Sequence, residues 1–211
     1  MLNANIVSMQ KSQFNPIPHD FYTRTDVVQI AYELLGKVLY TSFNNELTAG
    51  IIIETEAYAG VTDKASHAWN NRRTIRTEVM YQVGGLAYVY LCYGMHSLFN
   101  IVTSKKEDPQ AVLIRAIEPL HGKDIMARRK GKTLLIHKDG VGPGNVAKLL
   151  GIHVNISGLS LCQDLQIEQA IWIQDEGISV PDTEVKVGPR VGIEYAEEDA
   201  FLPFRYQWIK K

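Results

Sequence analysis

The sequence has little cysteine, no long apolar run and no excess of charge of one sign, and each of these absences narrows the possible functions. Only two cysteines occur in 211 residues, and Cys92 and Cys162 stand far apart, outside any C-x-x-C pattern. We therefore expect two buried free thiols in a reducing compartment rather than a disulfide or a metal site. No apolar run approaches the about 18 residues of a membrane span, and the first residues lack the charged and apolar segments of a secretory signal. These absences predict a cytoplasmic protein with no membrane partner.

The rest of the composition is ordinary for a globular domain, but its charge is unevenly distributed. The chain is 45% hydrophobic and 21% charged, with a formal net charge of −1, and this length can bury a sizeable core. Residues 64–148 hold 14 Lys and Arg against 6 Asp and Glu, a local charge of +8. Residues 164–211 hold 5 against 10, a local charge of −5. The segments "NNRRTIR", "KK" and "RRKGK" could neutralise a phosphate backbone, although solvated basic loops would give the same counts.

Hydrophobic periodicity predicts an α+β fold with an antiparallel β-sheet core, helices and a β-hairpin. We expect helices over residues 25–36, 121–131 and 144–151, each ending at a glycine, and a short helical piece over 63–69. We expect strands over residues 36–43, 48–58 and 111–120, with further strands in the last third of the chain. The stretch "AYVYLCYGMHSLFNIV" predicts a hairpin that holds Tyr93, Gly94 and Met95 at its tip.

The stretch "IIIETEAY" places charged residues at the end of a strongly apolar strand. Because successive side chains of a strand alternate between faces, Glu54, Glu56 and Tyr58 project to one side, about 7 Å apart. Burying a carboxylate is costly unless it is paired. Either the strand leaves the core for solvent here, or a carboxylate acts as a general base or an electrostatic stabiliser in a cleft.

Three further features could carry chemistry. Arg115 interrupts the apolar run "AVLIRAIEPL" and needs an anionic partner, for which Glu54 or Glu56 is a candidate; a purely structural ion pair is the alternative. His67 stands alone in "KASHAW", and a lone histidine is more often a structural hydrogen-bonding group than a catalyst. "GVGPGN" before a helix weakly indicates a phosphate-binding turn.

Several motifs together carry a resemblance to a known family. "IIIETEAYAG", "SHAWNNRRTIRTEVMY", "GLAYVYLCYGMHSLFNIV", "AVLIRAIEPL", "GPGNVAKLLGI" and "GPRVGI" with "LPFRY" occur in the order found in the alkyladenine DNA glycosylase family, from Phe21 to Tyr206. The resemblance implies an N-terminal arm over residues 1–20 and a single glycosylase domain over 21–211. It also implies that this domain has a curved antiparallel β-sheet core with surrounding helices and a protruding β-hairpin. It implies an enzyme that acts on double-stranded DNA containing damaged purines, without metal or organic cofactor. A monomer is the simplest expectation for an enzyme that binds a DNA groove. Such an enzyme excises the damaged base by hydrolysing its N-glycosidic bond.

The resemblance also assigns roles to residues. It implies that Glu56 activates water, which Arg115 and the backbone carbonyl of Val191 help to hold. The extruded base is expected between aromatic rings, with Asn100 gating the pocket against a purine 2-amino group. The residues matched to base binding are Tyr58, His67, Tyr90 and Asn100, and those matched to DNA contact are Tyr93, Met95, His96 and Arg72. Tyr93 is expected to fill the gap left by the flipped nucleotide.

No lysine matches a nucleophile position of the family, so the resemblance implies hydrolysis that leaves an abasic site without strand cleavage. Many substrates of the family are cationic alkylpurines, which an aromatic cage favours by about 0.5–2 kcal/mol. The preferred lesion stays open among 3-methyladenine, 7-methylguanine, hypoxanthine and ethenoadenine.

Two other functions remain open on the residues alone. One is a non-catalytic protein that recognises distorted nucleic acid with its aromatic hairpin. The other is a small-molecule glycosidase in which Glu54 and Glu56 approach the about 5–5.5 Å separation of a retaining carboxylate pair.

Overall fold

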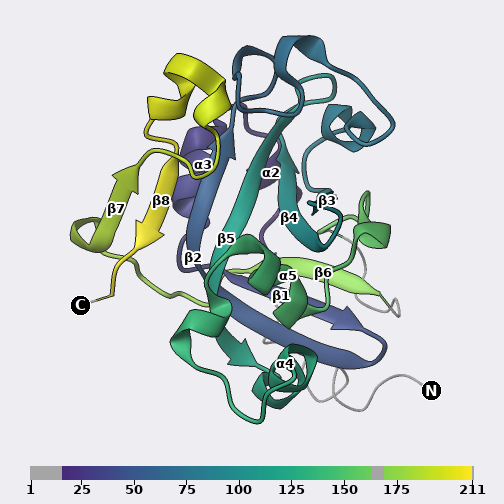
Figure 1. The fold of residues 1–211 in the computed structure, drawn as a ribbon, viewed down its shortest axis with the longest axis vertical. Coiled ribbons are helices and arrows are strands. Elements are labelled where there is room, and N and C mark those ends of the chain that lie inside the picture. The colour runs from purple at the N-terminus through teal and green to yellow at the C-terminus, as the bar shows by residue number, and fades with distance from the viewer. Residues whose placement is uncertain (1–15, 163–168, 211) are drawn as a thin grey trace.

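A computed structural model describes residues 16–162 and 169–210, which form a strongly curved antiparallel sheet flanked by helices (Figure 1). The strands are β1 (Val38–Phe43), β2 (Glu46–Tyr58), β3 (Ala87–Cys92), β4 (His96–Thr103), β5 (Gln110–His121), β6 (Ala170–Gln174), β7 (Val185–Gly188) and β8 (Arg205–Trp208). The helices are α2 (His19–Tyr22), α3 (Val27–Glu33), α4 (Lys123–Lys130) and α5 (Pro143–Leu150). Residues 1–15 lie outside the described part, so the arm over residues 1–20 stays a prediction.

Strand β2 is the longest strand and the one that positions the carboxylates. The sheet order is β3-β4-β5-β2-β1-β6, and β8 adds to β2 and pairs with β7. On the side away from β5, the first half of β2 pairs with β1, whereas Glu54, Thr55 and Glu56 pair with β8. The register between β2 and β5 shifts on both sides of Glu54. Such irregularities bend a strand and redirect its side chains, so the "ETEAY" stretch lies where β2 changes partner.

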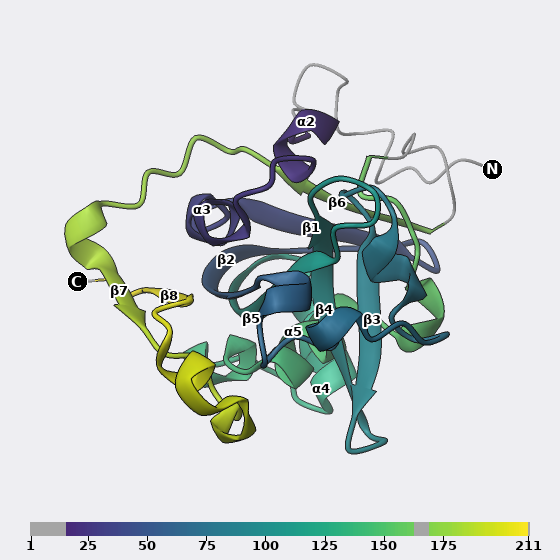
Figure 2. The ribbon, with the colours of Figure 1, turned by 90° about the horizontal axis from the view of Figure 1, so that it is seen from above.

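Helices cover both sides of the curved sheet. Helix α3 packs against β2 and β5, and α5 packs against β4 and β5. Helix α4 lies beside α5 and also contacts β2 (Figures 1 and 2). The Asp26 side chain accepts a hydrogen bond from the Gln29 N–H and so caps the start of α3. Isoleucine and leucine side chains of α3, α5 and the sheet are fully buried between these layers. The predicted α+β class and curved antiparallel sheet are confirmed.

The helical piece expected over residues 63–69 is wrong. This region holds turns and 3₁₀ segments at Gly60–Thr62 and Trp69–Asn71. The Asp63 carboxylate accepts hydrogen bonds from the backbone N–H groups of Ala59 and Ala65, 2.9 Å each. A side chain that binds nearby backbone groups in this way competes with helical hydrogen bonds, so the segment folds as a turn around Asp63.

The protruding hairpin is present as expected. Strands β3 and β4 are joined by a tight turn in which Tyr93 and Gly94 both have positive φ, 51° and 70°. This is the mirror-image turn geometry that suits the twist of a hairpin, and it is uncommon for a bulky residue such as tyrosine. The Tyr93 side chain is 89% exposed, and the turn projects from the body of the molecule (Figure 2). Local backbone strain and an exposed aromatic ring thus coincide at one residue.

Both cysteines are free, but the expectation that both are buried is wrong. Cys92 is half-buried near the hairpin turn, and Cys162 is exposed. Among the described residues, no helix is long and apolar enough to cross a membrane.

Candidate active site

Glu56 is fully buried and its carboxylate accepts three hydrogen bonds. Oε1 accepts from the backbone N–H of Val191 at 2.8 Å. Oε2 accepts from the Tyr58 hydroxyl at 2.9 Å and from Arg115 Nη1 at 3.2 Å. Burial raises the pKa of Glu56, while the charge of Arg115 and the two other donors oppose that rise. The strand therefore does not leave the core for solvent at this point. The Glu56 carboxylate has a raised pKa although three hydrogen-bond donors surround it.

Arg115 contacts both acidic residues of "ETEAY". Its Nε donates to Glu54 Oε1 at 3.1 Å, while its Nη1 reaches Glu56. Arg205 of β8 donates to the same Glu54 oxygen at 2.7 Å. The sequence predicts one acidic partner for Arg115, and the structure shows two carboxylates and two guanidinium groups in one cluster.

A cavity of about 440 Å³ lies in front of this cluster, a size typical of small-molecule sites. Arg115 and Val191 line it on one side, and Tyr93 stands at its edge. Its further lining includes Tyr58, His67, Met80, Tyr88, Tyr90, Leu98, Asn100, Pro143, Ile193 and Tyr195. All four residues matched to base binding therefore lie around one space. Glu56 itself does not line the cavity, but its three partners do.

One wall of the cavity is a cluster of three rings. His67 and Tyr90 meet edge to face, with centroids 4.6 Å apart, and Tyr88 lies 5.5 Å from Tyr90. His67 Nδ1 and the Tyr88 hydroxyl are 2.7 Å apart and share a hydrogen bond. Burial, together with the charges of Arg76 and Arg72, lowers the pKa of His67 to about 4. The imidazole is therefore neutral at neutral pH.

Tyr58 is held in place from behind by a buried ion pair. The Arg190 guanidinium lies 4.8 Å from the centroid of the Tyr58 ring. Arg190 in turn donates to both carboxylate oxygens of Asp63 and to the Ala57 carbonyl. Both charged side chains are almost completely buried. The turn around Asp63 and the position of Tyr58 thus both depend on the ion pair between Asp63 and Arg190.

Asn100 on β4 is buried beside the rings. Its Nδ2 donates to the carbonyl oxygens of Tyr88, at 3.1 Å, and Leu98, at 3.4 Å. These bonds fix the orientation of the amide at the cavity wall.

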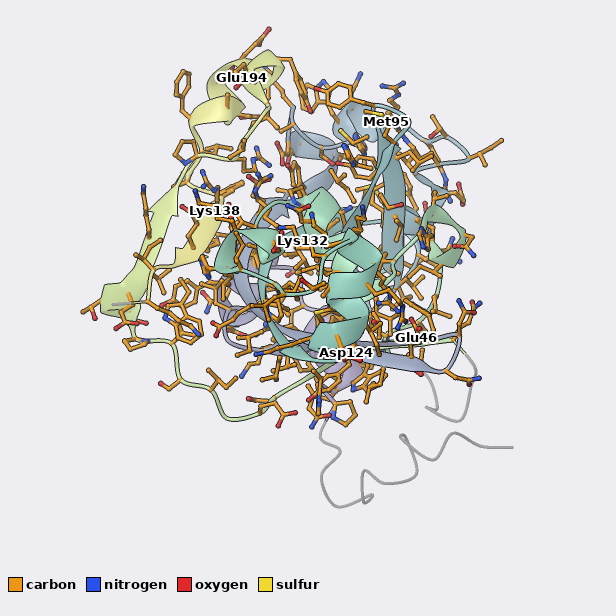
Figure 3. All side chains as sticks on the ribbon, turned by 60° about the horizontal axis from the view of Figure 1, so that its bottom comes forward. Glu46, Met95, Asp124, Lys132, Lys138 and Glu194 are labelled. Atoms are coloured by element: carbon orange, nitrogen blue, oxygen red, sulfur yellow. The ribbon has the colours of Figure 1, made fainter. Side chains whose placement is uncertain are left out.

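The three residues matched to DNA at the hairpin have different surroundings. Met95 is 72% exposed in the turn beside Tyr93. His96 is exposed at the start of β4 and lies against Gly144 of α5, where an added Cβ would be 3.2 Å from His96 Cβ. In Figure 3, Met95 and Glu194 lie toward one side of the molecule, and Glu46 and Asp124 toward the other.

The predicted basic face is only partly available to phosphate. Acidic partners neutralise several of its cations, in the pairs Arg73 with Glu78 and Glu107, Arg128 and Arg129 with Glu46, and Lys132 with Asp139. Arg72 and Arg76 are exposed, and Arg76 lies 6.0 Å from the centroid of the Tyr90 ring. Arg72 and Arg76, whose charges act on His67 at the cavity, are therefore exposed, while many of the other cations are paired.

Sequence reasoning missed Tyr88, Tyr195 and Arg190. Tyr88 had a usable signal, because strand alternation places it on the same face as Tyr90. Tyr195 and Arg190 lie outside regular strands. Arg190 stands in the motif "GPRVGI", but the motif does not indicate that it reaches Tyr58, and no motif indicates that Tyr195 lines the cavity.

A second cavity of about 510 Å³ lies near the end of β8. Much of its wall is apolar and consists of Ile53, Leu135, Ile136 and Trp208. Two charged residues of the wall, Lys210 and Glu118, form an ion pair with each other. It holds none of the residues to which the sequence assigns chemistry, so the candidate site is the cavity beside Glu56.

The chain is similar over most of its length to proteins of one known family. Residues 20–211 match the family model described as "Methylpurine-DNA glycosylase (MPG)". Relatives named "Putative 3-methyladenine DNA glycosylase" include one from Chlamydia felis, 46% identical over 195 residues that cover 90% of this chain and 94% of the relative. Similar proteins of the same name occur in Bacillus cereus (42% identical, 90% and 94% covered) and Desulfitobacterium hafniense (39% identical, 89% and 92% covered).

Proposed function

The chain belongs to the methylpurine-DNA glycosylase family and is a DNA glycosylase for alkylated bases, and we propose that it flips damaged purines out of duplex DNA and hydrolyses their N-glycosidic bonds. The observation that carries this proposal is the position of buried Glu56 directly behind an aromatic cavity, with an exposed tyrosine at the cavity edge. The product is an abasic site in an uncut strand, and the enzyme acts as a monomer in the cytoplasm.

In this proposal the extruded base enters the cavity between Tyr58 and the His67–Tyr90 pair. Ring faces favour a cationic alkylpurine by about 0.5–2 kcal/mol. His67 supports this selection because its lowered pKa keeps the imidazole uncharged, so it does not repel a cation. Deaminated purines such as hypoxanthine are neutral and receive less help from the rings.

Glu56 acts as the base for the attacking water. The water oxygen attacks the anomeric carbon, its proton passes to the Glu56 carboxylate, and the N-glycosidic bond breaks with its electrons leaving on the purine. The ionised Glu56 also stabilises the positive charge that develops on the sugar. A cationic base leaves without protonation, so a single carboxylate suffices for it.

Arg115 and Val191 orient this carboxylate and hold the water beside it. Val191 contributes in two ways in this proposal. Its N–H donates to Glu56, and its carbonyl is the second acceptor for the water. The sequence resemblance assigns only the carbonyl role.

Tyr93 fills the space that the flipped nucleotide leaves in the duplex. Unstacking a base costs a few kcal/mol, and an inserted aromatic ring recovers part of this cost by stacking on the neighbouring bases. The turn holds the ring away from the body of the protein, where it reaches the groove, with Met95 beside it. Arg72 then contacts the phosphates near the cavity.

The small-molecule glycosidase is disfavoured by the surroundings of Glu54. Its carboxylate is held by Arg115 and Arg205 and does not line the cavity. Of its two partners only Arg115 lines the cavity, whereas all three partners of Glu56 do. Glu54 is therefore placed to hold Arg115 rather than to act as the second carboxylate of a retaining pair.

The test is release of free base from methylated duplex DNA by the wild type and by Glu56→Gln. We expect base release and an alkali-labile abasic site with the wild type only, while the variant still binds the damaged duplex. Tight binding without base release by either protein would instead indicate a lesion-recognition protein.

A further inference from the structure

Glu54 is a buried carboxylate to which the proposed reaction gives no role. Its side chain is 7% exposed, and its described hydrogen-bond partners are two guanidinium groups. Nε of Arg115 and Nε of Arg205 both donate to Oε1. Burying a charge requires compensating partners, and here the partners come from two strands, β5 and β8, on either side of β2.

The contact with Glu54 fixes the direction of the Arg115 guanidinium. This group is planar and rigid, so holding its Nε edge determines where both Nη groups point. Nη1 reaches Glu56 Oε2 at 3.2 Å. Within residues 16–162 and 169–210, Nη2 has no hydrogen-bond partner, and Arg115 lines the cavity. The free donor is therefore on the member of this cluster of two carboxylates and two guanidinium groups that lines the cavity.

The local fold explains why Glu54 reaches this position. Side chains two residues apart on a strand share a face, so Glu54 and Glu56 both face Arg115 across the β2–β5 pair. The register shifts around Glu54 accompany the change of partner from β1 to β8. This change brings Arg205 next to Glu54 as a second cation.

We propose that Glu54 is a positioning residue that holds Arg115 so that one Nη group contacts Glu56 and the other meets the attacking water. The inference rests on the proposed function. Arg205 supplies a second positive charge, so the cluster contains two carboxylates and two guanidinium groups. Glu54 touches neither base nor sugar and acts only through Arg115.

The pH dependence of base release distinguishes the positioning role of Glu54 from a simple effect of its charge, because both act on the pKa of Glu56. Glu56 is faced by Glu54 and Tyr58 from β2, by Arg115 from β5 and by Tyr90 from β3, and Arg205 of β8 adjoins it through Glu54. Arg115 lowers the pKa of Glu56 more than Glu54 raises it. Removing only the charge of Glu54 therefore lowers that pKa, whereas releasing Arg115 raises it.

The experiment compares Glu54→Ala with Glu54→Gln in the full chain. Base release from methylated duplex DNA is measured in single turnover across pH, together with Kd for the damaged duplex. In Glu54→Ala, Arg115 loses the carboxylate that holds its Nε, so we expect the rate of base release to fall about 10- to 100-fold. The acid limb of the pH profile, where the rate falls as the pH decreases, should move to higher pH. The Kd for the damaged duplex should stay unchanged. In Glu54→Gln, the amide oxygen still accepts from Nε, so we expect most of the rate to return and the acid limb to move to lower pH.

Glu46→Ala is the matched control. Glu46 lies at the start of the same strand and also accepts from two arginines, Arg128 and Arg129. It lies on the opposite side of the molecule from Met95 of the hairpin turn (Figure 3). We expect its rate and pH profile to match those of the wild type.

Each outcome has a separate meaning. No base release by the wild type would refute the proposed function itself. Release by the wild type with an unchanged rate and acid limb in Glu54→Ala would overturn the positioning role alone. Equal losses of rate in both variants, with unmoved pH profiles and lowered melting temperatures, would show a merely structural residue. If Glu54→Ala does not fold, Glu54→Asp decides, because it keeps the charge but withdraws the carboxylate from Arg115 Nε by one methylene; an unchanged rate of base release in Glu54→Asp overturns the proposal.

Discussion

Replacing Tyr58 with phenylalanine separates two functions that the structure combines in one side chain. The ring forms one wall of the cavity, and the hydroxyl donates a 2.9 Å hydrogen bond to Glu56 Oε2. Tyr58→Phe keeps the ring and its contact with Arg190 but removes the donor. The change therefore acts on the carboxylate and leaves the stacking surface in place.

The expected size follows from the burial of Glu56. A hydrogen bond to a charged group contributes about 1.5–3 kcal/mol, which corresponds to about 1–2 units of pKa. Because the hydroxyl stabilises the ionised carboxylate, its bond lowers the pKa of Glu56, and removing it raises that pKa further. Glu56 must be ionised to accept the proton from water. The loss of activity on acidification should therefore begin about 1–2 pH units higher in Tyr58→Phe.

The assay is single-turnover base release from methylated duplex DNA as a function of pH. The affinity for the damaged duplex should remain that of the wild type, because the ring is retained. Tyr40→Phe is the matched control, since Tyr40 also donates to a glutamate, Glu176, away from the cavity. An acid limb that stays in place in Tyr58→Phe would refute the idea that this hydroxyl sets the ionisation of Glu56.

Two further predictions concern the hairpin and the support of the cavity. Tyr93→Ser should weaken excision from base-paired duplex more than from single-stranded DNA, because only the duplex needs its gap filled; equal losses on both substrates would argue against insertion of the ring. Asp63→Asn should lower the free energy of unfolding by about 3–5 kcal/mol, since it leaves the buried Arg190 charge without its partner. Urea denaturation measures this change, and a loss below about 1 kcal/mol, the size typical of exposed ion pairs, would refute the expected contribution of this buried pair.

Much of the fold follows from local patterns. Helices α3 and α5 were predictable because apolar residues recur at helical spacing and a glycine follows each pattern, and the end of α4 was predictable from Gly131. The hairpin was predictable from alternation on either side of Tyr93-Gly94. The segment over residues 63–69 was not, because Asp63 forms its hydrogen bonds with the nearby backbone and with Arg190, a residue more than a hundred positions away.

The candidate site was predictable in its residues but not in its contacts. The motifs identify Glu56, Tyr58, His67 and Arg115 as candidates, and the structure places Tyr58, His67 and Arg115 around one cavity with Glu56 behind it. The basic segments could be counted from the sequence, but their pairing with acidic residues could not. Ion pairs such as Arg129 with Glu46 join positions far apart in the chain.

The sequence by itself determined the class of fold, the family and the residue types available for catalysis, because periodicity and the order of motifs can be read along the chain without knowing which distant residues meet. Only the tertiary structure decided that Glu54 and Glu56 share Arg115, that Arg205 joins them, and that Glu56 is buried. These contacts arise where β2 changes its pairing partner from β1 to β8, and the pairing of β2 with β8 joins segments about 150 residues apart. Burial and charge pairing, which set the pKa of the carboxylate, exist only once those segments meet.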